Sequence, residues 1–240
     1  MTAIGLAGKD YPIFHRASWG GWFQGISLCI DDPTRNLNKI APTFYFGTKH
    51  ENYLLLIKNI ILKIKEIYNL NNSDITFISS SNGGFASISI ANSLDYSNCI
   101  AFCPQFSVKD YFSNPGLFEE TFDIKFENYE SRLTLFDFVK NKKSKFFIYT
   151  NIACDSDRRQ LDIFSQKINF KYTLGLQSVT DNIMLLVANI NSKIPHLAQP
   201  DVFSCLYFEC LLNDKIVTKK DKFACRSIIE LMKINYLSKH

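Results

Sequence analysis

The chain has 240 residues, 46% of them hydrophobic and 21% charged, proportions that fit a folded domain and exclude a disordered chain. With 27 basic and 23 acidic residues the net charge is only +4, which does not favour a nucleic-acid partner. No apolar run approaches the roughly 18 residues of a membrane span, and the N-terminus lacks a signal-peptide pattern. Seven cysteines without a Cys-x-x-Cys pair indicate neither a zinc knuckle nor a redox motif, and favour a cytoplasmic location.

Short apolar runs separated by turn residues predict buried strands. They lie at residues 11–14, 25–30, 75–79, 99–103, 146–150 and 183–190, with a weaker candidate at 43–46. Apolar positions spaced by three or four residues predict helices between the strands. These lie at residues 51–70, 84–94, 161–168 and 201–212. Because strands and helices alternate, we expect an α/β fold with a mainly parallel sheet covered by helices on both faces.

We expect a single domain over residues 1–240. Segment 105–140 is aromatic and acidic and too long for a simple crossover between two strands, so we interpret it as an insertion that caps one end of the sheet. The segment 214–240 carries apolar residues at helical spacing and is expected to form a C-terminal helical tail.

The most informative stretch is a predicted strand that runs into Ser79-Ser80-Ser81-Asn82-Gly83-Gly84 and then directly into a helix. This pattern resembles the nucleophile elbow of the α/β-hydrolase family, Gly-x-Ser-x-Gly, with Ser81 as the nucleophile. Ser79 replaces the first glycine, and its small side chain still permits the tight turn. An ordinary polar loop is the alternative interpretation.

The resemblance implies that an acid and then a histidine follow the serine along the chain. His196 comes just after the last apolar run and is the expected general base, because His240 is the chain's final residue. The acid should follow the strand at 146–150, where Asp155 and Asp157 are both candidates. We prefer Asp155, the first of the two, while Asp157 could instead cap the helix.

An oxyanion site is the remaining requirement of acyl chemistry. The backbone N–H of Asn82 would lie free at the helix N-terminus and could donate to a developing oxyanion. A second donor would come from the loop after the first strand, where Arg16 and Ala17 are the candidates.

The family resemblance covers roughly residues 11–213, with the first antiparallel strands of the full fold reduced. The segments Ile30-Asp-Asp-Pro, Phe44-Tyr-Phe-Gly-Thr-Lys-His, Ser79–Ser87 and Phe102-Cys-Pro-Gln look more narrowly like small serine-hydrolase-like proteins of bacterial surface-glycan assembly. This resemblance implies a serine esterase or acyltransferase acting on a small-molecule or glycan ester, without a metal or organic cofactor. The alternative is a catalytically inactive binding module of the same fold in surface-polysaccharide biosynthesis. Nucleotide binding at the glycine turn is less favoured, and the sequence leaves the oligomeric state open.

Overall fold

The computed structural model describes residues 17–23, 25–36, 42–197 and 199–214. Six α-helices and five strands lie within these residues. The helices are α1 (Tyr53–Ile67), α2 (Ser81–Asn92), α3 (Pro115–Phe122), α4 (Glu130–Leu133), α5 (Asp155–Lys167) and α6 (Val202–Asp214). The strands are β1 (Thr76–Ser80), β2 (Asn98–Phe102), β3 (Lys145–Asn151), β4 (Gly175–Thr180) and β5 (Ile183–Ala188).

The strands form one sheet in the order β1-β2-β3-β5-β4. The first four strands in this order are parallel, and only β4 pairs antiparallel, with β5. The parallel strands end at nearly the same level. Ser80 pairs with Phe102 and Asn151 pairs with Ala188, while Phe102 pairs with Tyr149, two residues before the end of β3. The loops after β1, β2, β3 and β5 therefore leave the sheet at the same edge, where ligands of open α/β sheets bind.

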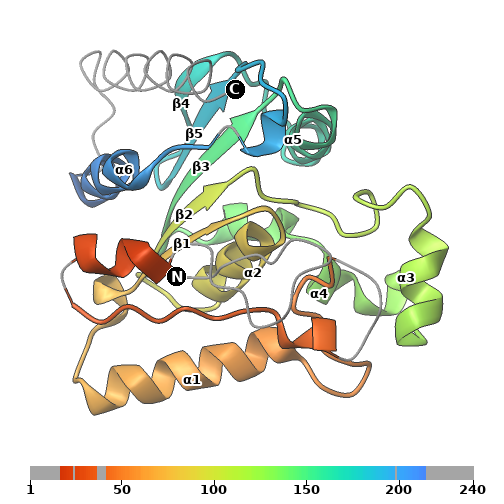
Figure 1. Ribbon diagram of the computed structural model, residues 1–240, viewed down its shortest axis with the longest axis horizontal. Coiled ribbons are helices and arrows are strands. Elements are labelled where there is room, and N and C mark those ends of the chain that lie inside the picture. Colours follow the sequence, from red (N-terminus) through yellow and green to blue (C-terminus); the bar gives the residue numbers. More distant parts are fainter. Residues whose placement is uncertain (1–16, 24, 37–41, 198, 215–240) are drawn as a thin grey trace.

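Helices cover both faces of the sheet because successive apolar side chains of the buried strands point to opposite faces and both faces must be covered. On one face, Phe146 and Ile148 of β3 join a core cluster with residues of α2 and α5, and α1 packs outside α2. On the other face, Phe147 stacks on Phe208 of α6 with ring centroids 4.0 Å apart. Figure 1 shows α6 on one side of the strands and α1 with α2 on the other. The α/β fold with a mainly parallel, doubly covered sheet is confirmed.

The chain from β2 to β3 forms a separate layer of short helices, α3 and α4, next to the α1–α2 side (Figure 1). Its ends lie side by side, because Ser107 and Thr134 form a β-bridge. The aromatic rings of this segment are buried: Phe118 and Phe122 pack edge-on against Phe46, and their burial joins the segment to the main core. We refer to residues 105–140 as the cap segment.

Three expectations about elements differ from the structure. Residues 43–46 form a turn and not a strand, since Phe44 and Tyr45 have φ angles of 55° and 56°. Residues 25–30 form no named strand, although Ile30 makes a single bridge. Strand β4 was not expected at all. The expected strand at 11–14 lies outside the described residues, as does the expected tail beyond Asp214.

The structure confirms four predicted helices, with shifted ends. They were predicted at 51–70, 84–94, 161–168 and 201–212 and correspond to α1, α2, α5 and α6. The runs at 75–79, 99–103, 146–150 and 183–190 are confirmed as β1, β2, β3 and β5. Among the residues that the structure describes, none belongs to a helix with the length and apolar character that crossing a membrane requires.

Candidate active site

Ser81 lies at a sharp turn between β1 and α2. Ser80 is still extended, with φ −140° and ψ 160°, and Ser81 follows as the first residue of the helix with φ 53°. A positive φ is unfavourable for a residue with a side chain and is typical of functional sites whose surroundings hold the strain. Ser79 and Gly83 on either side are buried, as the steric requirement for small residues at these positions predicts.

The Ser81 hydroxyl donates a hydrogen bond to Oε1 of Gln105, at 3.2 Å. Gln105 is buried, and its Nε2 donates in turn to the carbonyl oxygen of Cys103. From the sequence, Gln105 belonged to the segment Phe102-Cys-Pro-Gln but had no role of its own. Its position three residues after the end of β2 was the available signal, because β1 and β2 are parallel neighbours that end together.

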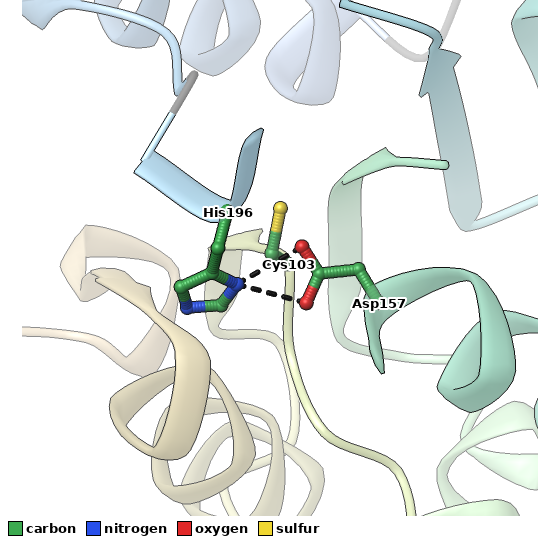
Figure 2. Close-up of side chains that lie close together, drawn as sticks. All are labelled: Cys103, Asp157 and His196. Atoms are coloured by element: carbon green, nitrogen blue, oxygen red, sulfur yellow. Dashed lines mark hydrogen bonds and ion pairs between the residues drawn. The ribbon is translucent and has the colours of Figure 1, made fainter. Parts of the chain in front are cut away.

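His196 and Asp157 form a close pair at the same edge of the sheet. Nδ1 of the imidazole lies 2.8 Å and 2.9 Å from the two carboxylate oxygens of Asp157 (Figure 2). The Asp157 side chain is 1% exposed, whereas that of His196 is 27% exposed. A buried carboxylate on Nδ1 selects the tautomer whose Nε2 is unprotonated and able to accept a proton.

Asp155, the preferred acid of the sequence analysis, does not contact His196 among the described interactions. Its carboxylate forms an ion pair with Arg158 at 2.6 Å and is 89% exposed. Both aspartates lie in the first turn of α5, but residues two apart on a helix point to nearly opposite sides. Asp157 is the one that faces inward, so the structure pairs the histidine with the second candidate.

The loop that carries His196 is fixed by Asn151, the last residue of β3. Its Nδ2 donates to the carbonyl oxygens of Ile190 and Pro195, and its Oδ1 accepts from the N–H of Ile190. Burying a side-chain amide costs free energy unless its N–H and C=O groups form hydrogen bonds, and those of the fully buried Asn151 do so here. Asn151 is thus a positioning residue that sequence analysis missed, because its partners lie about 40 residues away along the chain.

The expected oxyanion donors are only partly described. Asn82 is buried and is the second residue of α2. Because of this position its backbone N–H lies in the first turn, where helix N–H groups have no intrahelical partner. Ala17 begins the 3₁₀ turn Ala17–Trp22 and is exposed. Arg16 lies outside the described residues.

Cys103 lies beside the His196–Asp157 pair (Figure 2). Its Sγ, a carboxylate oxygen of Asp157 and a ring nitrogen of His196 all lie within 4.8 Å of one another. These side chains could hold a metal ion, although the sequence analysis expected none. The thiol is fully buried, and this burial, reinforced by the Asp157 carboxylate, raises the pKa of Cys103 well above its ordinary value.

No family model and no curated protein matches the chain. Its structure is similar to that of the capsule O-acetyltransferase of Neisseria meningitidis serogroup A, with a TM-score of 0.59 and 17% sequence identity over 88% of this chain and 86% of the other. It is also similar to the glycosylation associate protein (Gap123) complex from Streptococcus agalactiae, with a TM-score of 0.60 and 12% identity over 92% of this chain. The match covers 42% of the Gap123 chain. These similarities show that the chain shares its α/β fold with both proteins.

Proposed function

We propose that the protein is a serine acyl-transfer enzyme, an esterase or acyltransferase with Ser81, Asp157 and His196 as its triad. The observation that carries this proposal is the His196–Asp157 pair, because a buried carboxylate on Nδ1 leaves Nε2 as a base. The strained backbone of Ser81 at the same edge of the sheet supports it further. Asp157 takes the role for which the sequence had favoured Asp155.

The mechanism requires the Ser81 hydroxyl to leave Gln105 and donate to Nε2 of His196, and catalytic hydrogen bonds often tighten only when substrate is bound. His196 Nε2 takes the hydroxyl proton as Oγ bonds to the acyl carbonyl carbon. The carbonyl electrons move to oxygen, where the N–H of Asn82 stabilises the negative charge. The tetrahedral intermediate expels the leaving group, which takes the proton from His196, and an acyl-enzyme remains.

The acyl-enzyme is then resolved by a second hydroxyl. His196 removes the proton from that hydroxyl, whose oxygen attacks the acyl carbon, and Ser81 regains its proton as it leaves. Water gives hydrolysis, and a sugar hydroxyl gives O-acyl transfer. A capsule O-acetyltransferase and a glycosylation-associated protein are among the structures similar to this chain, which supports a glycan as acceptor or as ester substrate.

The test is replacement of Ser81 by alanine, with Ser79→Ala as the matched control because the Ser79 hydroxyl is buried nearby. We expect Ser81→Ala to lower hydrolysis of a short-chain aryl ester by about 10⁴-fold or more, and to abolish labelling by a fluorophosphonate probe. Ser79→Ala should retain labelling. Unchanged ester hydrolysis by folded Ser81→Ala would reject the proposal.

A catalytically inactive binding module is the second candidate. The observation that favours it is the bond from Ser81 to Gln105, which leaves the hydroxyl without a described hydrogen bond to His196. The same probe discriminates the two functions, because a folded wild-type protein that is never labelled would favour the binding module.

A further inference from the structure

The proposed mechanism makes no use of Cys103, yet the fold places its side chain beside the histidine and the aspartate. The residue follows β2 directly and has a φ of 44°, so the chain bends there, and its N–H donates to the carbonyl oxygen of Tyr149 at 2.6 Å. The bend holds the thiol fully buried beside the two other side chains (Figure 2).

We propose that Cys103, Asp157 and His196 form a binding site for a thiophilic divalent cation, Zn²⁺ in particular. The three candidate ligand atoms already lie within 4.8 Å of one another. Four-coordinate zinc holds its ligands at about 2.0–2.3 Å, which places ligand atoms about 3–4 Å apart, so only small side-chain movements are needed. A sulfur, an imidazole nitrogen and a carboxylate oxygen are the donor types that zinc prefers, and an exchangeable water would be the fourth ligand.

The ligands come from three separate segments. Cys103 follows β2, Asp157 lies in α5, and His196 lies in the 3₁₀ turn Pro195–Leu197 after β5. Each segment is anchored at the same edge of the parallel sheet, so the fold and not a local motif assembles the site. This arrangement explains why no metal-binding spacing is visible in the sequence.

Binding of Zn²⁺ to these ligands leaves no net charge at the site and releases one proton. The Cys103 thiol releases its proton to solvent, and the resulting thiolate and the Asp157 carboxylate neutralise the two charges of Zn²⁺. His196 binds as neutral imidazole. The 27% exposure of His196 provides the side from which an ion can enter, since the other two ligands are buried.

The site shares two residues with the proposed triad, so metal binding and acyl transfer exclude each other. An ion on His196 and Asp157 removes the base that Ser81 needs. Zn²⁺ therefore inhibits the enzyme, and a chelator restores its activity. Only this inhibition rests on the proposed function, because metal binding itself does not involve Ser81.

The experiment titrates Co²⁺ into the chelator-treated full chain and follows the thiolate-to-cobalt charge-transfer absorption. We expect a saturable band at one ion per chain, displaced by Zn²⁺, and unchanged in Ser81→Ala. Cys103→Ser should lose the band, and His196→Ala should weaken binding by more than about 10-fold, the effect that loss of even an outer-shell partner can reach. Cys99→Ala is the matched control, since Cys99 is buried four residues earlier at the start of β2.

A band that persists in Cys103→Ser, or its absence in the wild type at millimolar Co²⁺, would overturn the site. X-ray absorption at the zinc edge of the wild-type complex tests the same ligand set without any variant. One sulfur at about 2.3 Å with nitrogen and oxygen at about 2.0–2.2 Å is expected, and a shell without sulfur contradicts the proposal. If the metal-free, chelator-treated chain does not hydrolyse esters but still forms the cobalt band when Co²⁺ is added, only the acyl-transfer proposal is rejected.

Discussion

Asp155 and Asp157 are two positions apart in the first turn of α5, and only Asp157 is buried against the histidine. Replacement of Asp157 by asparagine keeps the shape of the side chain but offers an N–H where Nδ1 needs an acceptor. The imidazole then adopts the tautomer in which Nε2 carries the proton and cannot act as a base.

We expect Asp157→Asn to lower kcat for ester hydrolysis by about 10³–10⁴-fold with little change in KM. Asp155→Asn removes a carboxylate that is 89% exposed and should change kcat by less than about 2-fold. Steady-state kinetics on the two variants decides the assignment. Equal losses in both variants, or a loss only in Asp155→Asn, would contradict it.

Asp32 shows how a single buried carboxylate shapes the backbone. It accepts hydrogen bonds from the Thr43 hydroxyl and the Tyr45 N–H, both at 2.7 Å, and from the Thr34 N–H at 2.9 Å. These bonds hold Phe44 and Tyr45 in left-handed conformations that the residues would otherwise avoid. Burial raises the pKa of Asp32 above its ordinary value of 3.8, although the hydrogen bonds lower it in part.

A raised pKa in the folded state means that the folded chain binds the Asp32 proton more tightly than the unfolded chain. This contribution to stability is complete below the ordinary pKa and is lost as pH rises through the folded pKa. We expect the free energy of unfolding of the wild type, relative to Asp32→Asn, to decrease from about pH 4 toward neutrality. Urea denaturation at several pH values measures it, and a pH-independent difference would contradict the expectation.

At the scale of elements, α2 approaches the loop after β2 so closely that Gly84 has no room for a side chain. A Cβ built at Gly84 would lie 2.9 Å from Cβ and 3.1 Å from Cα of Pro104. The contact fixes the start of α2, with Ser81, against the loop that carries Cys103 and Gln105. Small residues in this helix therefore set the distance between the two segments of the site.

We expect Gly84→Ala to lower the free energy of unfolding by about 1–3 kcal/mol, because overpacking outweighs the better helix propensity of alanine. Gly21→Ala is the control, since nothing lies within 4 Å of a Cβ at Gly21. Urea denaturation should show the loss in the first variant and a change of less than about 0.5 kcal/mol in the second. A stabilised Gly84→Ala would contradict the close contact.

An element can be predicted from the sequence when its own residues determine it, and not when contacts with distant residues do. The four parallel strands are apolar on both faces and were predictable as continuous apolar runs. Strand β4 is half-exposed and polar, and within the described part of the chain it pairs with β5 alone, so its own residues carry little signal. Residues 43–46 have the composition of a strand, but the distant Asp32 carboxylate overrides that preference.

The site follows the same rule. The turn at Ser81 and the place of His196 after β5 were predictable from a local pattern and from the order of residues along the chain, and their catalytic roles stay predictions. The choice of Asp157 over Asp155 depends on which side of α5 faces the sheet, and the sequence analysis placed the start of that helix too late. The contacts of Asn151 and Cys103 join distant segments, which no spacing in the sequence reveals. For Gln105, which accepts the Ser81 bond, the one available signal was its place just after β2.

At the scale of the whole molecule, the two tryptophans and the cap segment lie on opposite faces of the sheet. Trp19 packs with the core cluster of the α6 face, and Trp22 contacts Phe203 of α6 with ring centroids 5.0 Å apart. The cap segment packs into the other cluster, where Phe118 is fully buried. If the chain is one domain, as we propose, a substitution that destabilises the cap segment also shifts the unfolding transition that the two tryptophans report.

Phe118→Ala should therefore lower stability by about 3–5 kcal/mol, the usual cost of deleting a buried phenylalanine ring. Its denaturation midpoint should shift equally by tryptophan fluorescence and by far-ultraviolet circular dichroism, because one cooperative transition unfolds both faces. Leu117→Ala on the same helix is the control, since Leu117 is 47% exposed and should shift neither probe appreciably. A shift seen by circular dichroism alone, with an unchanged fluorescence transition, would mean that the cap segment unfolds as a separate unit from the sheet and α6.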